Sequence, residues 1–363
     1  MSSLALHINC AGGNGFRLSV DCEVPAHGVT AVHGPSGSGK STLLDCVAGL
    51  RTPEPNSVVR LGDTAWQEHG HNTPPWKRGI AYVFQDARLF PHLNVLQNLQ
   101  YGMKRQSSRT ADKLDDIVQL LQLMELLPQE TDRLSAGQKQ RVAIGRALLS
   151  NPRLMLLDEP LANLDQAARQ QCLQCLQQLG QELRLPMLYV SHDIEEVSQI
   201  ADHLVLLDEG QITNQGSMLD LCSRLDTRLS HEEQAAAILS ATIAGHDEHY
   251  GLTRMDVEGQ PLLVNHLSQA AGQTRRVRIP ARDVSICRQR PTDSSILNIL
   301  PVTISEIEDS DAPRLLLRLA LGSQYLLARI TRKSNTELGL RVGDNVFAQI
   351  KSAALLMETA DPT

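Results

Sequence analysis

The chemistry in this sequence is concentrated in "GPSGSGKST", which fits the pattern G-x-x-x-x-G-K-[ST] without deviation. Glycines let backbone N–H groups face an anion, and the start of a helix favours negative charge. In such a loop the lysine, here Lys40, reaches the β and γ phosphates of ATP, and the hydroxyl of Ser41 binds Mg²⁺. The residues predicted to bind ATP are Gly34, Pro35, Ser36, Gly37, Ser38, Gly39, Lys40, Ser41 and Thr42.

Polar side chains that can act on the same phosphates follow three apolar segments. Asp158 and Glu159 end "LMLLDE", His192 follows "LYVS", and Gln85 follows "YVF". We expect Asp158 to bind Mg²⁺ and Glu159 to act as the base that polarises the attacking water, although adjacent acids can also merely cap the next helix. His192 is predicted to stabilise the γ phosphate or the water. Gln85 is predicted to complete the ligand shell of Mg²⁺ or the groups around the attacking water. The expected magnesium ligands are therefore Ser41, Gln85 and Asp158.

A second stretch with anion-binding character, "RLSAGQKQR", lies far along the chain from the first. Ser135 is placed to cap a helix starting near Gly137, and the free N–H groups there attract an anion. Gly137 permits close backbone approach. One nucleotide needs only one such cradle from a single chain. The second is therefore predicted to close on an ATP held by another copy, through Ser135, Ala136, Gly137 and Gln138.

The segments that must position these residues alternate between two patterns. Strands are predicted within residues 4–33 and at 80–86, 153–160, 187–193 and 203–210; helices are predicted at 40–50, 111–127, 136–150 and 166–183. Apolar strands that alternate with helices indicate a parallel sheet covered on both faces. The fold class is therefore α/β, of the phosphate-loop NTPase type, with the polar residues at the carboxyl edge of the sheet.

The pattern changes after about Leu229. Residues 231–252 look transitional, and short alternating stretches follow, at 276–280, 315–321, 324–331 and 345–351. This pattern predicts a small all-β domain, either a sandwich or a barrel. The predicted division is an ATPase domain at 1–229, a connecting segment with the start of the β domain at 230–291, and a regulatory domain at 292–363.

The composition narrows the class of protein. The chain has 363 residues, 42% of them apolar, and a net charge of −7, so no overall basic field draws it to nucleic acid or acidic lipid. Aromatic residues, at 3%, leave few platforms on which bases could stack. No apolar run has the roughly 18 residues of a membrane span, and the first residues lack the features of a signal peptide. Seven scattered cysteines predict reduced thiols and a cytoplasmic location.

Two local patterns have a functional and a plain interpretation. Cys172 and Cys175 lie one helical turn apart, as half a metal or redox site would, but no second Cys/His pair is near in sequence, which favours two packed thiols. Six arginines lie between residues 275 and 290. They could form a nucleic-acid or anion patch, but apolar residues alternate with them, which favours a solvated strand pair. We expect no nucleic-acid partner.

The ordered set of motifs resembles an ATPase subunit of the ABC-transporter family. It consists of the phosphate loop, Gln85, "LSAGQ", "LLDEP", "LANLD" and "SHD", and it spans residues 4 to about 225. The resemblance implies a head-to-tail homodimer with two ATP between the phosphate loops and the signature motifs, and "LSAGQ" is the signature motif of this chain. It also places Asp165 in a loop that crosses the interface. Ala136 stands where the family usually has glycine. The family also places an adenine-stacking aromatic residue before the phosphate loop, where this chain has only Phe16.

Within that family the chain resembles the molybdate importers. "VFQDARLFPH" with "YGMKR" carries this likeness, and "FPHLNVLQNL" looks like the region that receives a helix of the membrane permease. The resemblance implies integral membrane permease subunits as partners and, indirectly, a periplasmic or external molybdate-binding protein. It also implies a peripheral position on the cytoplasmic face of the inner membrane.

The C-terminal residues resemble the molybdate-binding Mop module, which is similar to an oligonucleotide-binding fold, over roughly residues 292–357. The matching oxyanion positions are Ser295, Thr331, Ser334, Lys351 and Ser352. Family members often carry arginine where this chain has Leu297, so the domain could instead be regulatory without binding molybdate. An importer of sulfate, tungstate or a sugar, or a soluble ABC protein of repair or translation, stays an alternative.

Overall fold

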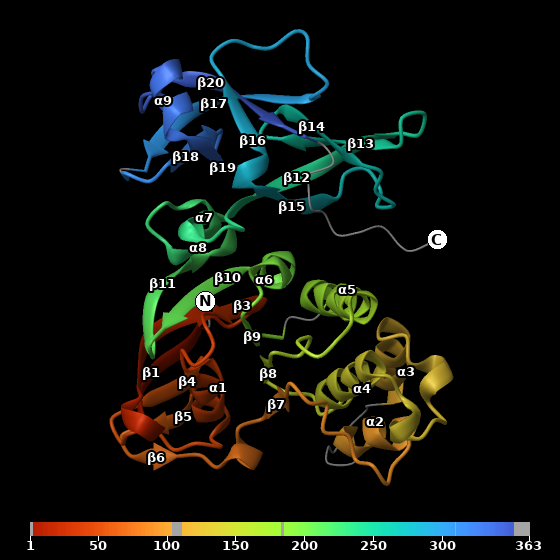
Figure 1. The fold of residues 1–363 in the computed structure, drawn as a ribbon. Helices are drawn as coiled ribbons and strands as arrows, with labels where there is room; N and C mark the ends of the chain where they lie inside the picture. The colour runs from red at the N-terminus through yellow and green to blue at the C-terminus, as the bar shows by residue number, and fades with distance from the viewer. Residues whose placement is uncertain (1–2, 104–110, 183–184, 309, 352–363) are drawn as a thin grey trace. The chain divides into compact units, whose positions relative to one another are not determined.

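The computed structural model describes residues 3–103, 111–182, 185–308 and 310–351. The chain divides into two compact units, Met1–Gly216 and Ser217–Thr363, shown in Figure 1. The division predicted from the sequence, with boundaries after residues 229 and 291, stays a prediction. Among the described residues, no helix is both long enough and apolar enough to cross a membrane.

Within the described part of the first unit, one sheet of eleven strands has the order β6-β5-β4-β1-β2-β11-β10-β3-β9-β8-β7. The run from β10 to β7 is parallel, as predicted. β1, β2, β4, β5 and β6 pair antiparallel with one another, and β2 also pairs parallel with β11. The strands are β1 (Ser3–Ala11), β2 (Arg17–Pro25), β3 (Val29–His33), β4 (Val58–Leu61), β5 (Thr64–Glu68), β6 (His71–Asn72), β7 (Ile80–Val83), β8 (Leu154–Asp158), β9 (Met187–Ser191), β10 (His203–Asp208) and β11 (Gln211–Ser217).

Helices cover this sheet and also form a group of their own. They are α1 (Lys40–Ala48), α2 (Val95–Met103), α3 (Ala111–Leu120), α4 (Ala136–Leu148), α5 (Gln166–Glu182) and α6 (Ile194–Ile200). α1 packs on β8 and β9, and α6 packs on β3 and β9. α4 contacts α2, α3 and α5, beside the β7 edge of the sheet in Figure 1. Apolar side chains of α1 and the parallel strands, such as Leu44, Leu156 and Val190, share one core.

The predicted helix at 111–127 is wrong in length, because α3 ends at Leu120. Gln122 adopts a left-handed backbone, with φ of 52°. The N–H of Leu123 then bonds to the carbonyl of Val118, and that of Gln122 to Gln119, which closes the helix in a Schellman motif. Glycine usually occupies the left-handed position, so a glutamine there gives no signal in the sequence.

The described part of the second unit is built mainly of strands, as predicted. Its elements are α7 (Met218–Ser223), α8 (Arg228–His231), β12 (Ala236–Asp247), β13 (Leu252–Val257), β14 (Gln260–Asn265), β15 (Thr274–Pro280), β16 (Val284–Cys287), β17 (Asn298–Ile307), β18 (Arg314–Leu321), β19 (Gln324–Thr331), α9 (Arg332–Leu338) and β20 (Asn345–Ile350). One sheet has the order β14-β13-β12-β15 and the other β16-β20-β17-β18-β19. Because β16 also contacts β19, the second sheet curls toward a barrel.

The segment that looked transitional in the sequence is strand β12, which pairs with both β13 and β15. The strands within the arginine-rich segment are β15 and β16, but they are not a pair: β15 pairs with β12, and β16 pairs with β20. Pairing between strands depends on the whole sheet, so alternation within one segment could not reveal it.

Candidate nucleotide-binding site

The phosphate loop turns sharply between β3 and α1. Gly37 and Gly39 have φ of 83° and 105°, a backbone region in which residues other than glycine are strained. A Cβ on Gly34 would lie 2.0 Å from the carbonyl oxygen of Leu207, so only glycine fits there. The loop therefore leads directly to the N-terminus of α1, where backbone N–H groups lack helical partners.

Lys40 is buried at the first position of α1, with 5% of its surface exposed. Its Nζ donates to the carbonyl oxygens of Gly34 and Pro35 at 2.8 and 2.9 Å. Burial lowers the pKa of its ammonium group, and the carboxylates of Glu159 and Asp158 partly offset this effect. The ammonium thus lies inside the loop, where it can meet phosphate oxygens.

Asp158 ends β8 beside Ser41 of α1, so the structure brings these two predicted magnesium ligands together. The Ser41 hydroxyl donates to Asp158 Oδ1 at 3.0 Å, and the Tyr82 hydroxyl donates to Oδ2 at 3.1 Å. Burial raises the pKa of the Asp158 carboxyl, while the two hydrogen bonds oppose that shift. A carboxylate and a hydroxyl are hard oxygen donors, so these residues fit Mg²⁺.

Glu159 follows Asp158 with a left-handed backbone, with φ of 44°. Its Oε2 lies 3.3 Å from His192 Nδ1, and its Oε1 lies 4.0 Å from Lys40 Nζ. Its side chain is 22% exposed and that of His192 is 54% exposed, so water reaches both. The structure therefore brings the expected base, the expected histidine and the phosphate-loop lysine together.

A cavity of about 410 Å³ lies at this edge of the sheet. It is lined by Gly12, Gly13, Phe16, Ser36, Gly37, Gly39, Lys40, Ser41, Thr42, Arg51 and Glu159. A Cβ on Gly39 would lie 2.8 Å from Phe16 Cζ, so the ring packs against the phosphate loop. The loop between β1 and β2 thus brings the one aromatic residue upstream of the phosphate loop to the pocket. Sequence reasoning missed Gly12, Gly13 and Arg51, which carry no recognisable motif.

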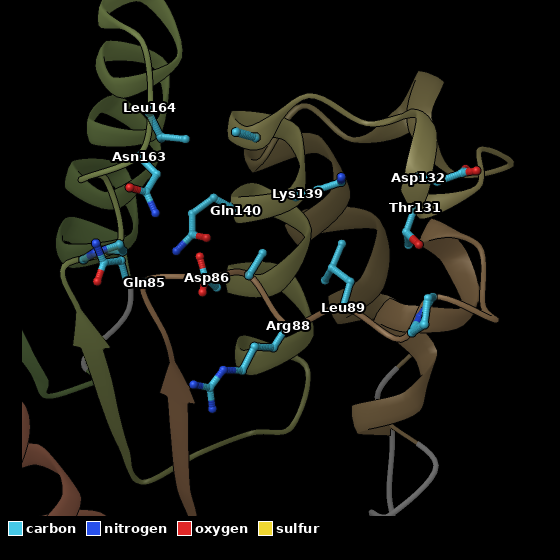
Figure 2. A pocket seen from close by; sticks show the side chains of 14 residues that line it. Gln85, Asp86, Arg88, Leu89, Thr131, Asp132, Lys139, Gln140, Asn163 and Leu164 are labelled. Atoms are coloured by element: carbon cyan, nitrogen blue, oxygen red, sulfur yellow. The ribbon is translucent and has the colours of Figure 1, made fainter.

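Gln85 follows β7, as the sequence predicted, and its role at the metal or the water stays a prediction. It lines a second cavity of about 460 Å³, shown in Figure 2, and is not among the residues that line the first cavity. The second cavity is open to solvent and is lined by the segment after β7, residues 131–132, the start of α4 and the loop before α5; Lys139, Gln140 and Asn163 point into it.

The turn before α4 is capped as predicted. Ser135 Oγ accepts from the N–H of Gln138 at 3.2 Å, and Gln138 Oε1 accepts from the N–H of Ser135 at 2.9 Å. The helix starts at Ala136, which is not in the left-handed region, so its methyl group is tolerated by the backbone. Close approach at Gly137 occurs within the chain, because a Cβ there would lie 2.6 Å from the Ala168 Cβ of α5.

Asp165 ends the loop that leads into α5. Its Oδ1 accepts from the N–H of Ala168 at 2.9 Å, which caps that helix. In the next turn, Arg169 Nη1 lies 3.4 Å from Asp193 Oδ2, and Asp193 caps α6 directly after His192. The loop of Asp165 and the segment of His192 are therefore linked through one ion pair.

The described oxyanion positions form two separate groups in the second unit. Ser295 precedes β17 and Lys351 follows β20, at the end where Asn298 pairs with Ile350. Thr331 and Ser334 lie at the other end, where the Thr331 hydroxyl caps α9 and lies 2.8 Å from the Ser334 hydroxyl. Leu297 is 59% exposed. Ser352 lies outside the described residues.

Both cysteines of α5 are core residues. Cys172 Sγ lies 3.8 Å from the carbonyl oxygen of Gly137, and Cys175 Sγ lies 3.5 Å from that of Leu120. Burial raises the pKa of Cys172 to about 12 and also raises that of Cys175. Among the residues that the structure describes, no group of three potential metal ligands was found. The two thiols pack as small apolar side chains.

The fold and this site define an ATP-binding cassette ATPase. The family model described as ABC transporter matches residues 18–162, and the TOBE domain model matches residues 294–357. Among solved structures, cbiO1 from Clostridium perfringens, part of the transporter complex cbiONQ, is 25% identical with a TM-score of 0.54. That comparison covers 63% of this chain and 96% of the other. The cassette MJ0796, solved as a dimer with ADP and Pi, shares the fold at 24% identity and a TM-score of 0.51, over 60% of this chain and 99% of the other.

Curated relatives narrow the class further. The molybdenum import ATP-binding protein ModC 1 of Azotobacter vinelandii is 46% identical over 346 residues, which are 94% of this chain and 96% of that protein. ModC of Methylococcus capsulatus is 45% identical over 343 residues, with 94% and 96% covered. The chain belongs to this ModC family of ABC-transporter ATPases.

Proposed function

We propose that this chain is the ATP-hydrolysing, energy-coupling subunit of a molybdate importer. The observation that carries the proposal is the 46% identity to a molybdenum import protein over 94% of the chain, which spans both units. The geometry of the phosphate loop and of Asp158, Glu159 and His192 supports the ATPase part. The identity of the transported ion as molybdate is inferred from the relatives alone.

The residues of the first cavity divide the work of hydrolysis. The backbone N–H groups of residues 36–42 and the start of α1 hold the phosphates, and Lys40 exchanges its loop carbonyls for phosphate oxygens. Ser41 and Asp158 would hold Mg²⁺, which neutralises charge on the transferred phosphoryl group. Glu159 polarises the attacking water, and His192 orients the Glu159 carboxylate across their 3.3 Å contact. Phe16 would stack on the adenine ring.

The second anion cradle would complete the site of another copy. The first turn of α4 contains Ala136, Gly137 and Gln138. The cap uses the N–H of Gln138, so the N–H groups that the helix start can present to an anion are those of Ala136 and Gly137. In a head-to-tail homodimer these groups would hold the γ phosphate bound to the partner's loop. The loop of Asp165 would cross the interface and, through Arg169 and Asp193, sense the position of His192.

Contact with membrane permease subunits would lie at the segment after Gln85. Asn98, which is fully buried, donates to the carbonyls of Phe90, Leu93 and Asn94 and so shapes this segment. Movement of the segment by a permease helix could carry Gln85 toward the metal or the water. The chain would then be peripheral on the cytoplasmic face of the inner membrane, with a periplasmic or external molybdate-binding protein as an indirect partner.

A further part of the proposal concerns the binding of molybdate by the second unit. Lys351 and Ser295 lie at one end of the β16–β19 sheet, and Thr331 and Ser334 at the other, so one copy cannot close all of them around one ion. Such a site would need one group from each of two chains. Exposed Leu297 beside Ser295 supplies no charge, which favours a weak site or a purely regulatory one.

A deletion strain grown on limiting molybdate, with nitrate as electron acceptor, tests the cargo. Cellular molybdenum should fall severalfold, and excess molybdate should restore growth. The full-length gene should restore uptake, as should Glu125→Gln, which changes an exposed glutamate; Glu159→Gln should not. A normal molybdenum quota in the deletion strain would rule out molybdate, and loss of sulfate, tungstate or sugar uptake would identify the alternative importer.

A further inference from the structure

The metal-site carboxylate has a partner that the proposed function does not use. Asp158 accepts hydrogen bonds at both oxygens: from Ser41, itself an expected magnesium ligand, at Oδ1, and from Tyr82 at Oδ2. Tyr82 lies in β7, and no motif of the phosphate site includes it. It is therefore a candidate for a role that acts through Asp158.

The pairing of β7 with β8 explains how the tyrosine reaches the carboxylate. The strands are parallel, and Tyr82 is the register partner of Leu156. Side chains two residues apart share a face, so Asp158 lies on the same face one step nearer the carboxyl edge, about 6.6 Å along the strand. A tyrosine side chain spans that distance, whereas shorter hydroxyl side chains do not.

The ring of Tyr82 is held in one orientation from its other side. It stacks on Phe84 with ring centroids 4.1 Å apart and an angle of 17° between the planes. The guanidinium of Arg88 lies 3.8 Å from the centroid of Phe84. Phe84 and Arg88 flank Gln85 in the chain, so the same stack connects the carboxylate to the Gln85 segment.

The hydroxyl has a single proton and two acceptors in reach. Asp158 Oδ2 is at 3.1 Å and Asp45 Oδ1 is at 3.5 Å, so the better hydrogen bond goes to Asp158. A neutral donor suits this place, because a cation bound to the same carboxylate would compete with Mg²⁺. Partners of this kind orient carboxylate ligands in metal sites.

We propose that Tyr82 is a positioning residue for the magnesium site: it fixes Asp158 Oδ2 so that Oδ1 stays directed at Ser41 and the metal. The inference rests on the proposed role of Asp158 as a magnesium ligand. It names Tyr82 as a determinant of metal affinity, separate from the residues that bind the nucleotide.

The test measures metal binding with Mn²⁺ as a spectroscopic substitute for Mg²⁺. The full chain is titrated with Mn²⁺ in the presence of a non-hydrolysable ATP analogue, and free Mn²⁺ is followed by electron paramagnetic resonance. Tyr82→Phe keeps the ring and its stack but removes the hydroxyl, so the apparent Kd for Mn²⁺ should rise about tenfold. Affinity for the analogue in EDTA should stay within about twofold of the original chain, a split that a general loss of structure would not give.

The matched control is Tyr189→Phe. Tyr189 of β9 also donates to a carboxylate, that of buried Glu196, so this variant loses the same group from the same sheet. It should bind Mn²⁺ like the original chain. If Tyr82→Phe fails to fold, as judged by thermal unfolding, Tyr82→Met serves as a second variant that lacks the hydroxyl but fills the space.

Asp158→Asn distinguishes a failure of the role of Tyr82 from a failure of the proposed magnesium site. If Asp158→Asn weakens Mn²⁺ binding and the Tyr82 variants do not, the inference is overturned and the proposed site stands. If Asp158→Asn also binds Mn²⁺ normally, the proposed magnesium site itself is wrong. Equal weakening by Tyr82→Phe and Tyr189→Phe would likewise overturn a specific role for Tyr82.

Discussion

At the scale of single residues, the surroundings of the nucleotide site change the pKa of His33, which has no role in the proposed hydrolysis. It directly precedes the phosphate loop, it is 7% exposed, and its Nδ1 lies 3.2 Å from the carbonyl oxygen of Ser191. Burial lowers its pKa to about 4, and nearby Lys40 adds to that effect, while the hydrogen bond to Ser191 opposes it. The imidazole is therefore neutral in the folded chain at neutral pH, and it links the ends of β3 and β9.

This depressed pKa predicts a loss of stability in mild acid. Between pH 6.5 and 4 the unfolded chain protonates His33 and the folded chain does not, so the free energy of unfolding falls as pH falls. By linkage, the contribution of His33 at pH 5 is a loss of about 2 kcal/mol relative to pH 7. Urea unfolding at the two pH values should show a smaller difference in His33→Gln than in the original chain. An equal difference in both would contradict the prediction. Glu196, whose pKa is raised to about 6 mainly by burial, gives the opposite slope in both proteins and cancels in the comparison.

At the scale of elements, α4 and α5 are in close contact at one point. Gly137 and Ala168 are the contact point, since a Cβ on the glycine would lie 2.6 Å from the alanine Cβ. The signature-like turn before α4 and the loop before α5 are therefore held in a fixed relation. Gly137 has a packing reason to be glycine, in addition to any contact with a phosphate.

A double-mutant cycle tests this contact. Gly137→Ala should lower the free energy of unfolding by about 1–3 kcal/mol through overpacking, and Ala168→Gly by about 1 kcal/mol through lower helix propensity. Together they should cost less than the sum, because Ala168→Gly removes the methyl group with which the new Cβ of Gly137→Ala would clash. Urea unfolding without nucleotide measures this without involving catalysis. Strict additivity would mean that the two helices do not meet at these residues.

At the scale of the whole molecule, the proposal requires two chains. Glu159→Gln should bind ATP without hydrolysing it, because a weakened general base costs about 10²–10⁴ in rate. The variant should therefore accumulate as a dimer in ATP and Mg²⁺, with twice the monomer mass by light scattering. Adding Ser135→Arg should abolish the dimer by blocking the capped turn, whereas Ser19→Arg, at an exposed serine of β2, should not. A Glu159→Gln chain that stays monomeric under saturating ATP would contradict the head-to-tail arrangement.

The two units also differ in how many of their strands and site residues could be predicted from the sequence. In the first, the phosphate loop and the ends of β7, β8 and β9 were predictable because loop motifs and strand ends are local patterns. In the second, β12 was not recognised, since its partners β13 and β15 lie later in the chain. The oxyanion positions were predicted one by one from a resemblance, yet the sheet places those that the structure describes at opposite ends.

The sequence by itself determined the nucleotide chemistry, since glycines, Lys40 and Ser41 must be adjacent to form a phosphate loop. It also determined that Asp158, Glu159 and His192 would meet, because parallel strands bring their carboxyl ends to one edge. Only the tertiary structure decided which second partners these groups have: Tyr82 on Asp158, Ala168 against Gly137, and a separate cavity for Gln85. Those relations join residues far apart in the chain, and no local pattern encodes the distance between two side chains that meet only after folding.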